Sequence, residues 1–280
     1  MEIDFLKMQG CGDDVIVVDG ARLPPEAVPH LPRLAGRMLD RGTGVGGMFL
    51  ILLGRGQEST VRCFGPQGNE TDLPCNGARC VARYATDSGA VTAERFSLRT
   101  ASGGIRIQII DSANVRVDMG RPFGPEQQAQ IEESPTGSFT RSILVDGKGL
   151  TYTPVSLGRS YAMVFVPSFS FPLRKKARSI AAEKEFPAAT GIGFVQVCSR
   201  ERLRLRFWEP DPGDPGDACV CAAAALVAST VNGFTEREVF VRLPGGEVFL
   251  QWEEPDNHIW LTGPASYVFT GSYDFEPDQE

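Results

Sequence analysis

Histidine is almost absent from this chain, with two residues, His30 and His258, among 280. The two lie far apart in the sequence and no repeated Cys-x-x-Cys pattern accompanies them, so neither a zinc site nor another metal centre is expected. Histidine is the usual general base near neutral pH. Any acid–base chemistry is therefore expected to use cysteine or carboxylate side chains.

Positive charge and long apolar runs are also scarce. The 28 Lys and Arg residues against 35 Asp and Glu give a net charge of −7, which argues against a nucleic-acid surface. No stretch approaches the roughly 20 apolar residues of a membrane helix, and the opening MEIDFLKMQG lacks the apolar region of a secretory signal. Seven cysteines without a disulfide-like spacing fit reduced thiols. We expect a cytoplasmic protein with a small-molecule partner and neither nucleic acid nor a membrane as partner.

The remaining sequence predicts an α+β protein, because many short β-rich runs accompany few helices. Helices are expected over 25–40, 77–89, 172–183 and 220–232. Strands are expected over 15–20, 48–54, 60–65, 94–110, 114–120, 141–146, 151–157, 161–166, 193–198 and 203–208, with a final β-rich stretch over 238–270. The Pro/Gly segment 120–128 marks the expected boundary between two halves.

Each half carries one helix that begins just after a cysteine-bearing turn, PCNGARC in the first and PGDACVC in the second. Cys75 and Cys219 thus stand at helix N-termini, where the helix dipole stabilises a thiolate. Two opposed acid–base groups can invert a carbon next to a carboxylate without a cofactor. The alternative for any single cysteine is a small buried hydrophobe. That structural role is expected for the other five cysteines, which are Cys11, Cys63, Cys80, Cys198 and Cys221.

Several blocks carry a resemblance to a known family. FLKMQGCGDDVIVVDG, CFGPQGNETDLPCNGARCVARY and DACVCAAAAL resemble, in order and spacing, motifs of the diaminopimelate epimerase family, and the similarity extends over essentially the whole chain. It implies two domains related by a pseudo-twofold axis, 1–121 completed by about 266–280, and 122–265. Each would be a curled, mainly antiparallel sheet around a central helix, with the active site in the cleft between them and no cofactor.

The functional residues differ from the family pattern at both helix starts. Either Cys75 and Cys219 serve as the catalytic pair, or an ungapped alignment places Pro74 and Ala218 in the catalytic slots. The family's Glu-Arg pair reads Glu209-Pro210, and Pro cannot replace the paired donors of Arg. We therefore expect a substrate other than standard diaminopimelate. The resemblance implies a set of substrate-binding residues, Asp13, Asn76, Gly77, Arg159, Glu209 and Val220.

Three functions remain open from the sequence. The leading hypothesis is a cofactor-independent, pyridoxal-phosphate-independent amino-acid epimerase or racemase, an isomerase that transfers protons between Cys75 and Cys219. A second is a double-bond isomerase of the same superfamily that does not use the cysteines, with Asp13, Glu209 or Asp217 as base. A third is a non-catalytic binding paralogue. The expected partners are a small carboxylate or amino acid and a second copy of the chain in a homodimer.

Overall fold

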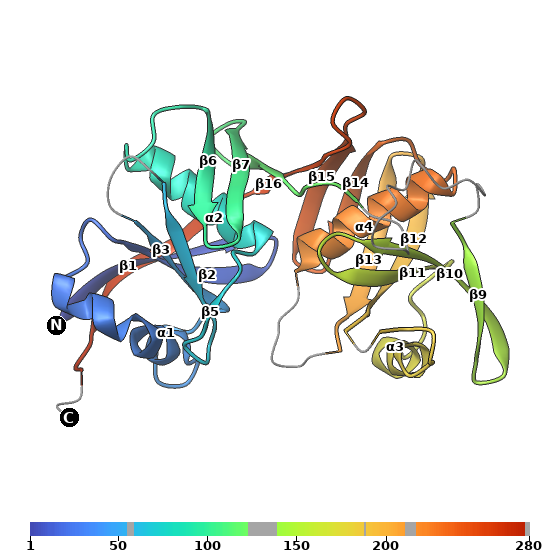
Figure 1. The fold of residues 1–280 in the computed structure, drawn as a ribbon, viewed down its shortest axis with the longest axis horizontal. Coiled ribbons are helices and arrows are strands. Elements are labelled where there is room, and N and C mark those ends of the chain that lie inside the picture. Colours follow the sequence, from blue (N-terminus) through green and yellow to red (C-terminus); the bar gives the residue numbers. More distant parts are fainter. Residues whose placement is uncertain (55–58, 123–138, 188, 211–216, 278–280) are drawn as a thin grey trace. The chain divides into compact units, whose positions relative to one another are not determined.

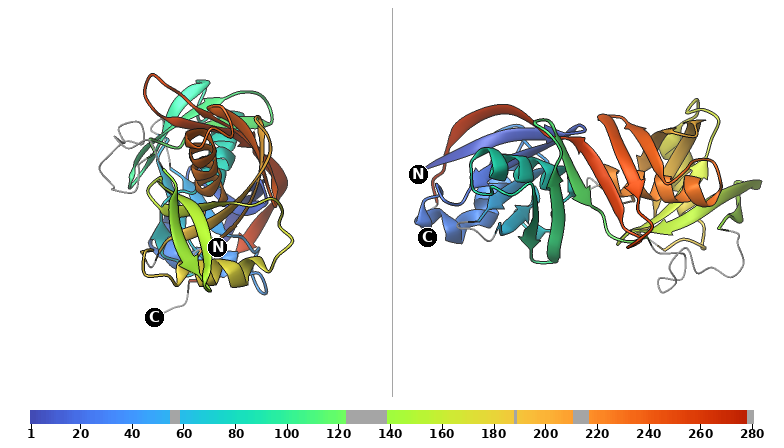
Figure 2. Two further views of the ribbon diagram at one scale, coloured as in Figure 1. Left: turned by 90° about the vertical axis from the view of Figure 1, so that its right-hand side faces the viewer. Right: turned by 90° about the horizontal axis from the view of Figure 1, so that it is seen from above.

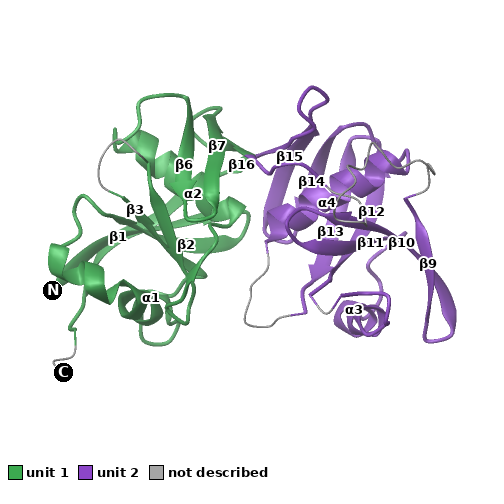
Figure 3. Ribbon diagram, in the orientation of Figure 1, with its two compact units in different colours: residues 1–117, 263–280 green, residues 118–262 purple. Residues whose placement is uncertain are grey.

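The computed structural model describes residues 1–54, 59–122, 139–187, 189–210 and 217–277. The chain divides into two compact units, residues 1–117 with 263–280, and residues 118–262 (Figure 3). Most of the Pro/Gly segment 120–128 lies outside the described residues.

The first unit contains a six-stranded sheet in the order β17-β1-β2-β3-β4-β5, together with the antiparallel strands β6-β7-β8 of the 11-stranded sheet. Only the β2–β3 pair of the six-stranded sheet is parallel. Its elements are β1 (Glu2–Gly10), β2 (Asp13–Asp19), η1 (Pro25–His30), α1 (Leu31–Leu39), β3 (Phe49–Leu53), β4 (Val61–Phe64), β5 (Glu70–Thr71), α2 (Cys75–Asp87), β6 (Arg95–Thr100), β7 (Gly103–Ile109), β8 (Asn114–Asp118) and β17 (Ser266–Asp274) (Figure 1).

The six-stranded sheet is covered by a helix on each face. Strand β3 reads FLILL and all five residues are buried, as expected of a strand covered on both sides. Leu50 and Leu52 belong to the core that contains the apolar residues of α1. Ile51, between them, points the other way toward α2, where a Cβ on Gly77 would lie 2.7 Å from its Cδ1. Glycine at position 77 therefore lets α2 approach the sheet closely.

The second unit is a mixed sheet in the order β16-β15-β14-β13-β12-β11-β10-β9. The β11–β12 and β13–β14 pairs are parallel and the other described pairs are antiparallel. Its elements are β9 (Arg141–Val145), β10 (Lys148–Ser156), β11 (Ser160–Phe165), α3 (Leu173–Ala181), β12 (Gly191–Ser199), β13 (Arg202–Trp208), α4 (Ala218–Val231), β14 (Glu238–Leu243), β15 (Gly246–Trp252) and β16 (Ile259–Pro264).

This sheet is also covered by a helix on each face, and the residues of β12 contact both helices. Its residues Ile192 and Phe194 share a core with Ala177 and Ile180 of α3. Gly193, on the opposite face, lies against Cys221 of α4, with 3.4 Å between an ideal Cβ and the Sγ atom. Helix α4 packs against β10 to β15, and its sequence ACVCAAAALVASTV is apolar on every side, as expected of a helix surrounded by strands (Figure 2). The α+β class is thus confirmed, with mixed sheets in both units.

Two local expectations differ from the structure, and one strand was not expected. The predicted helix 25–40 divides into η1 and α1, because Pro29 and Pro32 lack the N–H groups that a continuous helix needs. Strand β1 was not predicted, although Ile3 and Phe5 alternate with exposed residues as in a half-buried strand. Cys198 is exposed rather than buried, because it lies at the end of β12, where the neighbouring Val197 also faces solvent. None of the helices among the described residues is long and apolar enough to cross a membrane.

Candidate active site

Cys75 is the first residue of α2, and its side chain is buried. Pro74 precedes the helix, where the missing N–H of proline removes no helical hydrogen bond. One turn later, Arg79 directs its guanidinium back along the same helix face, and Nη1 donates to Cys75 Sγ over 3.5 Å. A cation beside a sulfur at a helix N-terminus favours the thiolate over the thiol. The sulfur of Cys75 thus lies at a helix N-terminus and in contact with a guanidinium.

Asn76 connects this arginine to the neighbouring strand. Its amide nitrogen donates to Asp13 Oδ2, and its amide oxygen accepts from Arg79 Nη2. Arg79 Nε donates to the carbonyl oxygen of Pro264 over 3.3 Å. Asn76 and Arg79 are both fully buried. Two residues that the sequence predicted as substrate ligands, Asp13 and Asn76, are therefore in contact, and Arg79 joins them although the sequence analysis did not select it.

The start of α4 is built differently, because its cap is a charged side chain. Asp217 precedes the helix, and its Oδ1 accepts from the backbone N–H of Cys219 at 2.8 Å and from that of Val220 at 3.3 Å. A carboxylate at this position stabilises the helix through both hydrogen bonds and the helix dipole. Cys219 itself is completely buried. These two N–H groups, which could otherwise hold an anion, hydrogen-bond to the chain's own carboxylate.

Glu209 follows directly after β13 and accepts a hydrogen bond from the hydroxyl of Tyr161 at 2.8 Å. Tyr161 lies on β11 and is 1% exposed. Burial first, and then the negative charges around it, raise the pKa of Tyr161 well above its ordinary value, so the phenol keeps its proton. Burial likewise raises the pKa of Cys221, together with the charges of Glu209 and Asp217. Cys221 therefore remains a thiol, which agrees with a structural role.

Two glycines on β12, Gly191 and Gly193, leave space for neighbouring side chains. A Cβ at position 191 would lie 2.7 Å from Tyr161 Cε1 and 3.0 Å from Glu209 Oε2. A Cβ at position 193 would lie 2.5 Å from the sulfur of Met163. The Tyr161 ring thus occupies space that a larger residue at 191 would fill. The sequence analysis did not select Tyr161, although the pairing of a bulky residue with a glycine on the adjacent strand was a usable signal.

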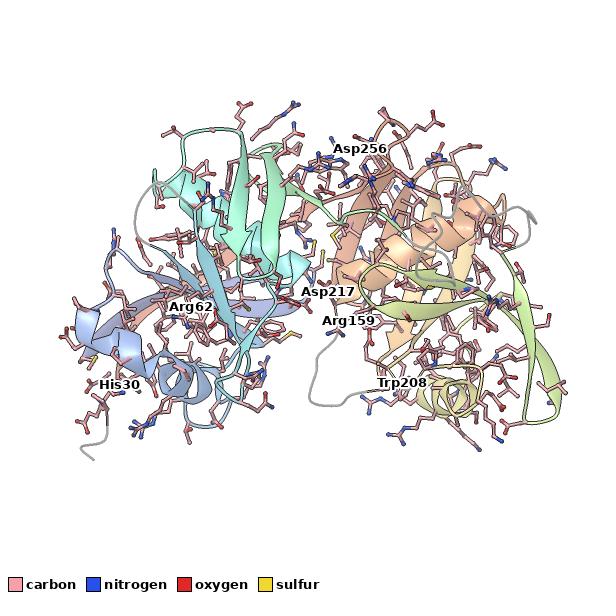
Figure 4. The ribbon with its side chains drawn as sticks, in the orientation of Figure 1. His30, Arg62, Arg159, Trp208, Asp217 and Asp256 are labelled. Carbon is pink, nitrogen blue, oxygen red and sulfur yellow. The ribbon has the colours of Figure 1, made fainter. Side chains whose placement is uncertain are left out.

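Arg159 is exposed in the turn between β10 and β11, where its carbonyl oxygen accepts from the N–H of Leu157. Figure 4 labels Arg159 and Asp217, the residues at this turn and at the start of α4. No group of three His, Cys, Asp or Glu residues suited to a metal ion occurs in the part of the chain that the structure describes. The side chains described above carry thiols, carboxylates, a phenol and guanidinium groups.

Solved structures of low sequence identity share this fold. A phenazine biosynthesis protein of the PhzF family from Enterococcus faecalis matches with a TM-score of 0.67 at 15% identity, over 98% of this chain and 100% of that one. A hydroxyproline epimerase from Agrobacterium vitis matches with a TM-score of 0.61 at 13% identity, over 97% of this chain and 91% of that one. These matches support the described architecture.

Sequence comparison is more specific. Residues 5–123 and 153–268 match the family described as diaminopimelate epimerase. The diaminopimelate epimerase of Desulforapulum autotrophicum is 34% identical over 97% of this chain and 99% of its own length. The chloroplastic diaminopimelate epimerase of Oryza sativa is 35% identical over 96% of this chain and 80% of its own length. The chain therefore belongs to the diaminopimelate epimerase family of isomerases.

Proposed function

We propose that this protein is a cofactor-independent amino-acid epimerase that inverts an α-carbon by proton transfer between two cysteines, Cys75 and Cys219. The observation that carries the proposal is the placement of both residues in the first turn of the sheet-packed helix of their own unit. Family membership supports the reaction class. The guanidinium beside Cys75 supports its role as the group that begins as a thiolate.

The proposed reaction needs one base and one acid on opposite faces of the substrate. A thiolate removes the α-proton, and the other cysteine, as a thiol, returns a proton to the opposite face. The carbanion that forms between these steps requires hydrogen-bond donors directed at the substrate carboxylate. Asn76, Gly77 and Val220, in the first turns of α2 and α4, are our candidates for that contact, together with Arg159, because a guanidinium pairs with a carboxylate through two hydrogen bonds.

We further propose that the substrate is a small carboxylate other than standard diaminopimelate. In unit 2, the first-turn N–H groups of Cys219 and Val220 already bind the carboxylate of Asp217. An incoming carboxylate would have to displace that side chain or bind elsewhere. Glu209, with Pro210 after it, and Asp13 are proposed to recognise a positively charged group of the substrate. Since the curated relatives carry the name diaminopimelate epimerase, both diaminopimelate isomers belong in any substrate panel.

A second candidate function deserves a test because of Tyr161. Its buried hydroxyl donates to one carboxylate oxygen of Glu209 and so fixes the position of that side chain. Glu209 could then act as the base of a double-bond isomerase that does not depend on cysteine. A methylitaconate-delta-isomerase is among the solved structures of this fold, with a TM-score of 0.63.

The test is deuterium uptake by mass spectrometry. Reduced protein is incubated in D2O with pooled amino acids, both diaminopimelate isomers and several unsaturated carboxylates. We expect one compound to gain deuterium at its α-carbon, and we expect Cys75→Ser and Cys219→Ser each to slow that uptake about 100-fold or more. Cys198→Ser, at an exposed cysteine, is the matched control. Uptake that survives both cysteine variants but fails in Glu209→Gln would favour the second function. Binding of a compound without any uptake would indicate a non-catalytic paralogue.

A further inference from the structure

A buried chain of hydrogen bonds in the first unit ends at the candidate catalytic sulfur. It begins at Asp13, passes through the side-chain amide of Asn76 to the guanidinium of Arg79, and ends at Cys75 Sγ. Arg79 has no exposed surface, and Cys75 is 5% exposed. The three side chains on α2 occupy positions 75, 76 and 79, so the first two turns of one helix orient most of these hydrogen-bonded groups.

The guanidinium of Arg79 donates hydrogen bonds to neutral oxygen atoms and to the ionisable sulfur of Cys75. Its guanidinium donates to the carbonyl oxygen of Pro264, to the amide oxygen of Asn76 and to Cys75 Sγ. The sulfur of Cys75 is an acceptor that can become an anion. A buried cation is costly unless charge or hydrogen bonds compensate it, so the burial of Arg79 favours the negative form of the sulfur. The N-terminus of α2 favours the same form.

We propose that Arg79 is a positioning residue for Cys75: its guanidinium, held in place by Asn76 and Asp13, keeps the sulfur as a thiolate at the start of α2. This inference rests on the proposed function, in which Cys75 is one of the two bases. It assigns the role of the thiolate in the resting protein to Cys75 rather than to Cys219. Proton removal would accordingly begin from the side of the substrate that faces Cys75.

Other charged groups on the strands that pack against α2 are engaged elsewhere. Lys7 of β1 forms an ion pair with Asp14 of β2 at 2.7 Å. Asp19, at the far end of β2, accepts a hydrogen bond from the hydroxyl of Tyr84, which lies about two and a half helical turns after Cys75. Strand β3 carries no charged residue, and Arg106 of β7 is exposed. Arg79 is thus the cation in described contact with the sulfur, and Asp13 acts on it through Asn76.

The experiment is a thiolate titration that needs neither substrate nor activity. Absorbance at 240 nm is followed against pH for the protein and for Cys75→Ser, and the difference reports Cys75 alone. We expect a midpoint below about 8.5, the ordinary value for cysteine. In Arg79→Gln the midpoint should rise by about one pH unit or more, and Arg79→Lys, which keeps the charge, should restore part of the shift.

Arg83→Gln is the matched control, because Arg83 lies on the same helix and pairs with Asp87. It should leave the midpoint unchanged. If Arg79→Gln does not fold, the titration of the unsubstituted protein still tests the proposal. A midpoint for Cys75 at or above about 8.5 would overturn it. An equal midpoint in folded Arg79→Gln would overturn it as well.

The titration also separates this inference from the proposed function. A low midpoint that depends on Arg79, found in a protein that exchanges no substrate hydrogen, would leave the role of Arg79 standing and remove the epimerase. Cysteine-dependent hydrogen exchange with an ordinary titration midpoint for Cys75 would support the epimerase and remove the proposed role of Arg79.

Discussion

The hydroxyl of Tyr161 donates a hydrogen bond to Glu209 Oε1 over 2.8 Å, and this bond joins β11 to the end of β13 across the intervening strand β12. It fixes the position of a carboxylate next to the start of α4. Because the ring of Tyr161 is buried, water cannot easily replace its hydroxyl as the donor to this oxygen.

Removing that hydroxyl tests the contact directly. Tyr161→Phe should lower the free energy of unfolding by about 1 kcal/mol, since Glu209 loses a donor while the ring remains. Urea denaturation of Tyr161→Phe, Glu209→Gln and the double variant forms a complete cycle. We expect a coupling energy of about 0.5 kcal/mol or more between the two positions. Strictly additive effects would mean that the hydrogen bond contributes nothing to stability.

Substitution of the glycine opposite Tyr161 should be poorly tolerated. Gly191→Ala places a methyl group 2.7 Å from Tyr161 Cε1, which forces the ring or the strand to move, at a cost of about 1 to 3 kcal/mol. Gly149→Ala, on strand β10 of the same unit, is the control because an added Cβ there meets nothing within 4 Å. Thermal unfolding of the two variants should differ clearly. Equal midpoints would show that the strands adjust without cost.

The cap of α4 gives a matched pair of variants. Asp217→Ala removes the acceptor for two backbone N–H groups and should cost about 1 kcal/mol. Asp217→Asn retains an acceptor oxygen and should cost much less. If the freed N–H groups then hold a substrate carboxylate, Asp217→Ala should also lower KM relative to Asp217→Asn. Identical stability of the two variants would argue against the cap.

Cys63 should make the stability of the protein decrease at alkaline pH. Burial, with the nearby charges of Asp72 and Glu70, raises the pKa of Cys63 from 9.0 to about 12. The neutral thiol is therefore favoured by folding, and its contribution is complete below pH 9.0 and lost as pH rises toward 12. Urea unfolding of the protein and of Cys63→Ala across this range should show a steeper decline for the unsubstituted protein. Parallel declines would mean that Cys63 ionises as easily in the folded chain as in the unfolded one.

The stability of the protein at acid pH should depend on Asp14. Burial alone would raise its pKa, but hydrogen bonds from Arg41 and Lys7 outweigh that effect and hold the pKa below 3.8. The ion pairs thus contribute above pH 3.8, and their contribution is lost as pH falls through the lowered value. Asp14→Asn should remove part of the acid dependence of unfolding. An unchanged acid midpoint in Asp14→Asn would contradict the account.

Much of the fold was predictable because its signals are local. The helix that begins at Cys75 was expected over 77–89, and the structure has it at Cys75–Asp87, since an apolar, alanine-containing segment follows a proline turn. The split of 25–40 into two helices does not follow from the apolar pattern, because it depends on the missing N–H groups of Pro29 and Pro32. Cys198 was placed inside because cysteine is usually buried, whereas the exposure of a strand end depends on what packs above it.

The site was less predictable, because its contacts join residues that are far apart in the sequence. Asp13 meets Asn76 across 63 positions, and Tyr161 meets Glu209 across 48. No local pattern contains either pairing. Arg79 was different, since its spacing of four residues from Cys75 places both on one helix face. That spacing was readable from the sequence, but whether the guanidinium would turn toward the sulfur was not.

The most direct test of the central claim follows the isotope in each direction of the reaction. Each epimer of the identified substrate is converted in D2O, and recovered substrate and product are analysed early by mass spectrometry. Two-base transfer predicts deuterium in the product, protium in the recovered substrate, and loss of conversion in both Cys75→Ser and Cys219→Ser. Conversion at an unchanged rate in the variant that lacks both cysteines would contradict the account.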